Sequence, residues 1–326
     1  MSTAVALGVD VGGTNVRVAA VAADGGVVAT GRAPTPFGDV EALVAAIAGL
    51  VREVEAEVEV EVGGERDAAV PLPVGVGVAG TVDRGGTVRY AANTGLSDAP
   101  VQDRLRASLE RTVVVRNDAT MAMWGESRAG AARSADDAVL LTLGTGVGGG
   151  LVVGGRLVEG HTGQATELGH VIVLDNGRRC PCGNLGCLEA YASGTSIGRR
   201  ASGRLATWDR GSSMDGLEPV SGADVVAAAR AGDELALEVL DEAGTWLGVG
   251  IASLVNALDP AVVVIGGGAG SDAFELLHPT LLRALRSRVF GLAGRTLPNV
   301  VAAELGDSAG VVGAALLARD HQEDRP

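Results

Sequence analysis

The chain has 326 residues, of which 47% are hydrophobic and 20% charged, and its formal net charge is −14. This length and composition are typical of a globular protein with two domains, and no apolar run reaches the length of a membrane span. The acidic balance, without a basic cluster, argues against nucleic acid as a partner. The first residues lack a signal-peptide pattern, so we expect a cytoplasmic protein with no membrane partner.

The chain contains no lysine, so all 26 of its basic residues are arginine. This excludes a Schiff-base lysine and a phosphate loop of the Gly-Lys-Ser/Thr type. Any phosphate group bound here must be held by backbone amides, hydroxyls, arginine or Mg²⁺.

The first predicted unit is a strand, a glycine turn and a second strand over residues 7–21, followed by a third short apolar run. The turn and its flanks contain Asp10, Gly12, Gly13, Thr14 and Asn15. Free amides beside a threonine hydroxyl can hold phosphate, and a carboxylate at the strand end suits Mg²⁺. An ordinary tight hairpin would also use these glycines, and this alternative stays open.

The next segments are a predicted helix over residues 39–52 and an alternation of Glu and Val over residues 53–62. The alternation is compatible with either a charged helix end or an edge strand. A β-branched run then ends at Asn117 and Asp118, before a helical stretch. Because open α/β sheets bind ligands at the carboxyl ends of strands, Asp118 is a candidate general base; alternatively it caps the helix.

A second strand, glycine turn and strand occupy residues 139–153, with Gly144, Thr145 and Gly146 in the turn. The repeated plan predicts a duplicated α/β architecture with one glycine turn from each half. Further along, helices are predicted over residues 235–258 and 274–288. A buried strand over residues 261–265 leads into Gly267 and Gly268, where a nucleotide base could approach the backbone or the chain could simply turn into a helix.

All three cysteines of the chain fall within eight residues, at Cys180, Cys182 and Cys187, and His170 precedes them. Three thiols and an imidazole form the ligand set of a closed structural Zn²⁺ site. The alternatives are a disulfide, which the odd count disfavours, or unrelated core thiols, which the clustering disfavours. A metal here would also fix the nearby Glu167 and Glu189, which predicts a small-molecule site beside it.

Six motifs together resemble the ROK family (repressors, open reading frames and kinases), and among its members the bacterial glucokinases. They are Asp-Val-Gly-Gly-Thr-Asn at 10–15, Asn-Asp at 117–118, Leu-Gly-Thr-Gly-Val-Gly-Gly-Gly at 143–150, Glu-Leu-Gly-His at 167–170, Cys-Pro-Cys-Gly-Asn-Leu-Gly-Cys-Leu-Glu at 180–189 and Ile-Gly-Gly-Gly at 265–268. The resemblance runs from about residue 5 to about residue 318. It implies an actin-like, ribonuclease-H-like fold in which two α/β domains enclose a cleft.

On this resemblance, residues 1–117 form a small α/β domain completed by a C-terminal helix at about 307–320. Residues 118–306 form a large domain that carries the zinc site. The implied reaction is phosphorylation of a sugar 6-hydroxyl by ATP with Mg²⁺, and Asp118 is the implied base. The implied sugar ligands are Asn93, Asn117, Asp118, Glu167, His170 and Glu189. The implied nucleotide contacts are Asp10, Gly12, Gly13, Thr14, Asn15, Gly144, Thr145, Gly146, Gly267 and Gly268. A homodimer or higher homo-oligomer is also implied.

Several alternatives remain within and beyond this reading. Fructose, mannose, allose or an N-acetylhexosamine could replace glucose, and polyphosphate could replace ATP. Thr120 and Leu188 depart from the residues common in the family, which weakens the prediction of the hexose. A catalytically silent sugar sensor is disfavoured by the intact Asp118 and glycine turns. A transcription regulator is disfavoured because only nine residues precede Asp10, too few for a helix-turn-helix.

Overall fold

The computed structural model describes residues 3–62 and 71–323, which divide into two compact units. The first unit comprises residues 1–134, 150–166 and 307–326, and the second comprises residues 135–149 and 167–306. Residues 118–134 and 150–166 thus lie in the first unit, whereas the sequence-based division put them in the larger domain. The domain boundaries after residues 117 and 306 stay a prediction.

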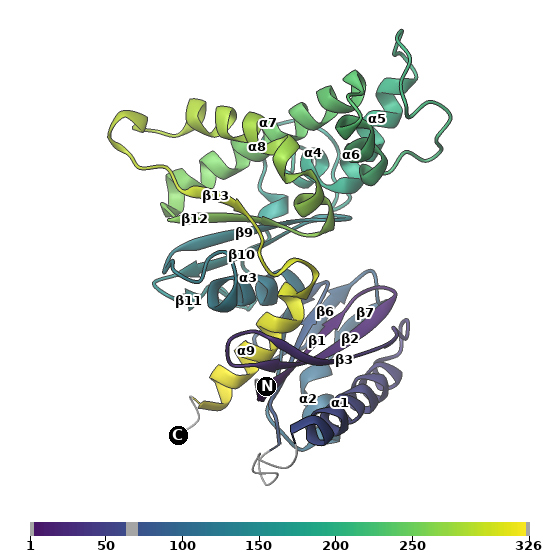
Figure 1. Ribbon diagram of the computed structural model, residues 1–326, viewed down its shortest axis with the longest axis vertical. Helices are drawn as coiled ribbons and strands as arrows, with labels where there is room; N and C mark the ends of the chain where they lie inside the picture. Colours follow the sequence, from purple (N-terminus) through teal and green to yellow (C-terminus); the bar gives the residue numbers. More distant parts are fainter. Residues whose placement is uncertain (1–2, 63–70, 324–326) are drawn as a thin grey trace. The chain divides into compact units, whose positions relative to one another are not determined.

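The sheet of the first unit has five strands in the order β3-β2-β1-β4-β8. Figure 1 labels β1, β2 and β3 of this sheet. Its strands are β1 (Ala4–Val11), β2 (Asn15–Ala22), β3 (Val27–Pro34), β4 (Val74–Val78) and β8 (Val113–Asn117). The hairpins β1-β2 and β2-β3 are antiparallel, whereas β4 is parallel to β1 and β8 is parallel to β4. Because parallel strands end at the same edge, the turn after β1 and the residues after β8 lie along one edge of this sheet.

A second sheet repeats this plan in the order β11-β10-β9-β12-β13. Its strands are β9 (Ala138–Leu143), β10 (Val147–Val153), β11 (Arg156–Leu157), β12 (Val262–Gly266) and β13 (Asn299–Ala302). Strand β12 is parallel to both β9 and β13, while β10 and β11 form a hairpin. The predicted duplication is therefore confirmed. A small third sheet in the first unit contains β5 (Thr81–Val82), β6 (Val88–Ala91) and β7 (Leu96–Ala99).

Among its described residues, the first unit contains the helices α1 (Val40–Val62), α2 (Val101–Leu109), α3 (Asp118–Ala129) and α9 (Ala309–Glu323). Alternate residues of β1 point to opposite faces, so Leu7 and Val9 join the core that α1 also lines. On the other face, Gly8 lies so close to α9 that a Cβ there would be 1.8 Å from the carbonyl oxygen of Val311. Helix α9 therefore rests directly on the sheet (Figure 1). The Glu/Val alternation over residues 53–62 belongs to α1, so it is a helix end and not a strand.

The second unit contains α4 (Glu189–Ala192), α5 (Gly194–Leu205), α6 (Gly222–Arg230), α7 (Glu234–Leu258) and α8 (Gly268–Arg288). The two helices predicted over residues 235–258 and 274–288 are confirmed as α7 and α8, although α8 begins earlier than predicted. They pack closely at Gly248, where a Cβ would lie 2.4 Å from the carbonyl oxygen of Leu281. No helix within residues 3–62 or 71–323 combines the length and apolar composition that a membrane span requires.

Candidate active site

The first glycine turn joins β1 to β2 in the first unit, and hydrogen bonds from Thr35 stabilise it. Thr35 donates its hydroxyl to the carbonyl oxygen of Gly12 at 2.7 Å, and its amide to that of Thr14 at 2.9 Å. Gly13 and Thr14 are exposed. The bracing fixes the carbonyl side of the turn and leaves its outer side for a ligand.

Two predicted residues lie beside this turn. A Cβ on Gly13 would be 3.1 Å from the Cβ atom of Asn93, so the structure brings Asn93 next to the turn. Asp10, near the end of β1, accepts a hydrogen bond from Arg17 at 2.8 Å through Oδ2. Arg17 also donates to the carbonyl oxygen of Asp307 at 3.2 Å. Asp10 is thus already paired with the guanidinium group of Arg17. A Mg²⁺ ion bound at this position must share the carboxylate of Asp10 with Arg17 or displace Arg17 from it.

The pair Asn117 and Asp118 stands where β8 passes into α3. Asn117 is the residue that caps the helix, because its side-chain oxygen accepts the amide of Thr120 at 3.0 Å. Its side-chain nitrogen donates to the carbonyl oxygen of Gly80 at 3.1 Å. The alternative in which Asp118 caps the helix is therefore wrong. Asp118 is the first helical residue of α3.

The second glycine turn is tied to Glu189 in the second unit. Glu189 Oε2 accepts the amide of Val147 at 3.0 Å, immediately after the turn. A Cβ on Gly146 would lie only 2.5 Å from the same oxygen. The amide of Gly144 donates to the carbonyl oxygen of Gly146 at 2.9 Å. The carboxylate predicted as a sugar ligand thus also sets the shape of the predicted phosphate turn.

Glu167 and His170 lie at the two ends of one short helical turn, whose 3₁₀ helix η1 spans Leu168–His170. The amide of His170 donates to the carbonyl oxygen of Glu167 at 3.0 Å. Partial loss of hydration raises the pKa of the Glu167 carboxyl group; the charge on His170 opposes this rise and that on Glu189 adds to it. The three predicted polar groups of the second unit therefore interact electrostatically.

The four predicted metal ligands meet in space. One ligand atom from each of His170, Cys180, Cys182 and Cys187 lies within 4.8 Å of the other three. The Sγ atoms of Cys182 and Cys187 are 3.7 Å apart, and Cys180 Sγ is 3.7 Å from Nδ1 of His170. A tetrahedral site with Zn–S bonds of about 2.3 Å has S–S edges of about 3.8 Å, so the cluster has the right size for Zn²⁺. With Nδ1 facing the thiols, Nε2 of His170 is left for another partner.

The loop that carries the cluster is held by further contacts within the second unit. Backbone bridges join Ile172 to Cys187 and Arg179 to Leu185. The Tyr191 hydroxyl accepts the amide of Arg178 at 2.8 Å, and the Tyr191 ring contacts that of Trp246 in α7. Cys180 Sγ also lies 3.5 Å from Oε1 of Glu189. A metal in this cluster would therefore hold Glu189 from one side, while the glycine turn holds it from the other.

A cavity of about 570 Å³ opens beside the second glycine turn, entirely within the second unit. Gly144 and Thr145 line one end, and the other walls come from the starts of α5 and α6 and from Ala269 in α8. Backbones approach closely here, since the amide of Gly194 donates to the carbonyl oxygen of Gly144 at 2.8 Å. Gly267 has a φ of 75°, and a Cβ there would lie 2.5 Å from the carbonyl oxygen of Leu143, so only glycine allows α8 to begin directly beside strand β9. The geometry suits an elongated phosphorylated ligand.

The cavity includes residues that sequence reasoning missed, at the starts of α5 and α6. Ser193 and Ser221 each cap a helix whose first residue is glycine, and Gly222 lies so close to Gly194 that a Cβ would be 2.7 Å from its carbonyl oxygen. The repeated Ser-Gly pair was the available signal. It is weak, because serine is a common cap at the start of any helix.

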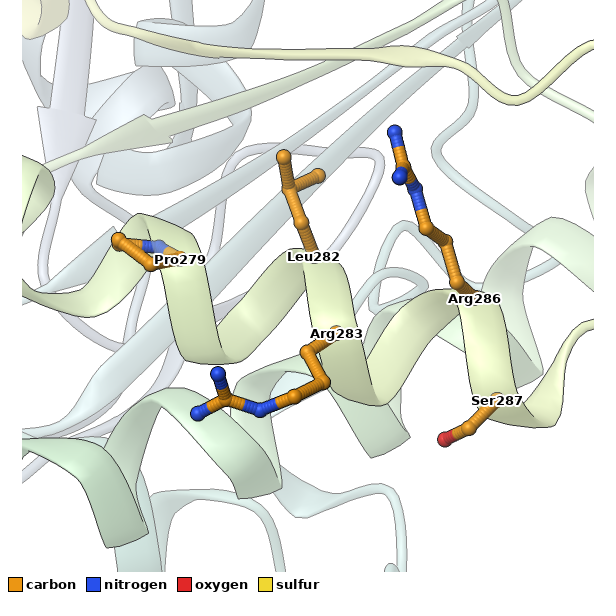
Figure 2. A pocket seen from close by; sticks show the side chains of 5 residues that line it. All are labelled: Pro279, Leu282, Arg283, Arg286 and Ser287. Atoms are coloured by element: carbon orange, nitrogen blue, oxygen red, sulfur yellow. The ribbon is translucent and has the colours of Figure 1, made fainter.

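A second hollow, on the outer side of α8, contains none of the predicted site residues. Figure 2 shows its five lining residues, Pro279, Leu282, Arg283, Arg286 and Ser287, all from the same helix. A binding site needs walls from more than one element to remove a ligand from water. We therefore assign no ligand to this surface.

Comparison with known proteins gives one consistent result. A glucokinase of Streptomyces coelicolor is 36% identical over 96% of this chain and 97% of its own length. An N-acetyl-D-glucosamine kinase of Pectobacterium atrosepticum is 33% identical over 95% of this chain and 97% of its own. The crystal structure of a ROK family glucokinase from Streptomyces griseus in complex with glucose and AMPPNP matches with a TM-score of 0.81 and 36% identity, over 97% of this chain and 99% of that one. The fold is thus the predicted actin-like α/β fold of sugar kinases. Because the ROK family model matches residues 6–321, the chain belongs to the ROK family.

Proposed function

We propose that the protein is an ATP-dependent glucokinase that transfers a phosphoryl group to the 6-hydroxyl of D-glucose. The observation that carries the proposal is the position of Asp118, the first residue of α3 at the carboxyl end of β8. It is supported by the similarity to glucokinases along nearly the whole chain. Phosphoryl transfer needs positioned reactants, charge neutralisation and a base for the attacking hydroxyl.

Asp118 is the proposed general base. Asn117 is the residue that caps α3, and Asp118 follows it as the first helical residue. Gly77 faces it from β4, since a Cβ there would lie 3.4 Å from the Cα atom of Asp118. The backbone of Asp118 is therefore held in a fixed place between two secondary-structure elements. A fixed carboxylate can orient the sugar hydroxyl and accept its proton.

The donor is proposed to be ATP with Mg²⁺, held without lysine. The amides and threonine hydroxyls of the Gly12–Thr14 and Gly144–Gly146 turns would contact phosphate oxygens. Asp10 and Asn15 would contact the Mg²⁺ ion and the phosphates, and Asp10 also forms an ion pair with Arg17. Gly267 and Gly268 would border the adenosine.

The acceptor ligands are proposed to be Asn93, Asn117, Glu167, His170 and Glu189. In this assignment His170 binds structural Zn²⁺ through Nδ1 and leaves Nε2 for a sugar hydroxyl. The zinc supplies no step of the reaction; it fixes the positions of His170 and Glu189. A homodimer or higher homo-oligomer is part of the same proposal and can be tested by light scattering.

The experiment that tests the base compares Asp118→Asn with Asp103→Asn. Asn keeps the shape of Asp118 but cannot accept the proton, so kcat for glucose should fall at least about a hundredfold with glucose binding largely retained. Asp103 is exposed on α2 and serves as the control, with kcat expected to match the wild type. Near-normal turnover in Asp118→Asn would move the role to another carboxylate.

A second candidate acceptor is an N-acetylhexosamine, because the relative from Pectobacterium atrosepticum is a kinase for N-acetyl-D-glucosamine. The polar set of Glu167, His170 and Glu189 is compatible with either sugar. The two candidates differ in kcat/KM for glucose against N-acetylglucosamine at equal concentration. A higher value for the N-acetyl sugar would leave a kinase but replace the acceptor.

A further inference from the structure

The cavity beside the second glycine turn has both polar and apolar lining. Gly144 and Thr145 line it at the turn, and the amide of Gly194 donates to the carbonyl oxygen of Gly144 at 2.8 Å. Pro219 and Val220 also line it and offer apolar surface. A nucleotide with its phosphates at the glycine turn can therefore place its base against this apolar lining.

Helix α5 forms one side of the cavity between these ends. Thr195, Arg199 and Ser202 line it at positions i, i+4 and i+7, which lie on one face of a helix. With a rise of about 1.5 Å per residue, Arg199 is about 6 Å farther along the helix axis than Thr195. Because Gly194 at the start of α5 contacts Gly144 in the glycine turn, Arg199 lies farther from that turn than Thr195 does.

Arg199 differs from the other arginines of this helix in its surroundings. Arg200 binds Glu242 at 2.7 Å and Arg204 forms an ion pair with Glu238. Arg199 is exposed, and among the described residues its side chain has no hydrogen-bond or ion-pair partner. Of the described residues that line the cavity, it is the one that carries a charge. An unpaired guanidinium in a chain of net charge −14 is available for a ligand.

We propose that Arg199 binds the donor nucleotide by stacking its guanidinium plane on the purine base. The proposal rests on ATP being the donor, as proposed above. A guanidinium stacks on aromatic rings because it is planar, delocalised and weakly hydrated. The contact makes the protein prefer an adenine nucleotide to a donor without a base, such as inorganic polyphosphate.

The test measures AMPPNP binding by calorimetry and the KM for ATP in the wild type, Arg199→Ala, Arg199→Lys and Arg200→Ala. Loss of a partly exposed stacking contact should raise the Kd for AMPPNP and the KM for ATP about five- to tenfold in Arg199→Ala. Arg199→Lys should recover only part of this, because lysine keeps the charge without the plane. The KM for glucose should stay within about twofold, and Arg200→Ala should bind AMPPNP like the wild type.

The outcomes separate the two levels of the proposal. Equal Kd values for AMPPNP in Arg199→Ala and Arg200→Ala would overturn the role of Arg199. A wild-type Kd in Arg199→Lys would also overturn it, because the charge alone would then explain the binding without stacking. Wild-type protein that binds no AMPPNP and does not use ATP would instead refute the proposed donor, and the role of Arg199 would fall with it.

Discussion

The second glycine turn offers a matched pair of substitutions, Gly144→Ala and Gly146→Ala, for which the structure gives opposite expectations. Neither residue has φ in the left-handed region, so alanine is conformationally allowed at both. A Cβ on Gly144 meets nothing within 4 Å, whereas a Cβ on Gly146 would lie 2.5 Å from Oε2 of Glu189. That oxygen must move, and it then loses its 3.0 Å hydrogen bond from the buried amide of Val147.

The expected magnitudes follow from these contacts. Losing a hydrogen bond to a charged acceptor costs about 1.5–3 kcal/mol, and alanine regains about 0.4–1 kcal/mol through the unfolded chain. Gly146→Ala should therefore destabilise by about 1–2 kcal/mol, which lowers the thermal midpoint by about 2–5 °C in a protein of this size. Gly144→Ala loses no contact, so its midpoint should be unchanged or slightly higher.

The KM for ATP should distinguish the same two variants, and here Gly144→Ala is the variant with the larger expected effect. The methyl group of Gly144→Ala enters the space beside the cavity where the donor phosphates are proposed to lie, so the KM for ATP should rise at least about tenfold in a folded protein. Differential scanning fluorimetry and a coupled kinase assay on both variants make the comparison. Equal losses of thermal stability in the two variants would refute the account of Glu189 as the brace of this turn.

Three further outcomes are expected. Elemental analysis should find one zinc per chain, and Cys182→Ala should lose it and lower the thermal midpoint by at least about 5 °C; wild-type protein purified without chelator that holds no zinc would contradict this. Glu167→Gln should raise the KM for glucose more than it lowers kcat, and the reverse pattern would move the proposed base from Asp118 to Glu167. Although burial acts against it, Asp233 has its pKa lowered by hydrogen bonds from Ala236, Ser213 and Ser212, so its carboxylate stabilises the fold above the unfolded pKa of about 3.9. That contribution is lost as pH falls through the folded pKa. The thermal midpoint of the wild type should therefore exceed that of Asp233→Asn by less below about pH 4 than at neutral pH. A larger difference between the two midpoints below about pH 4 would contradict the lowered pKa.

Features with a short-range cause could be predicted from the sequence. Glycine turns between apolar runs marked β1, β2, β9 and β10, because hairpins with these residues are determined locally. The cluster of candidate metal ligands was also predictable, since three of its four residues lie within eight positions and this combination of residue types is typical of Zn²⁺ sites. Its loop geometry follows from nearby backbone bridges between residues of the same segment.

Features that depend on distant packing could not be predicted. The Glu/Val alternation of residues 53–62 suits a strand as well as a helix, and the helix α1 that precedes it decides the outcome. The cap of α3 is Asn117 and not Asp118, a difference of one residue that side-chain bonding settles. The cavity beside the second glycine turn forms where α5, α6 and that turn meet, and no local sequence pattern indicates that they do. Likewise, the contact of Gly8 with Val311 joins opposite ends of the chain.

The most direct test of the central claim is a coupled assay with ATP·Mg²⁺ across glucose, mannose, fructose, allose, N-acetylglucosamine and N-acetylmannosamine at equal concentration. A polar set that includes Glu167, His170 and Glu189 should penalise an epimer that leaves one of these groups unpaired, so glucose should rank first in kcat/KM. An N-acetyl sugar in first place would contradict the proposed acceptor, and absence of ATP-dependent turnover with every sugar would contradict the proposed kinase activity itself.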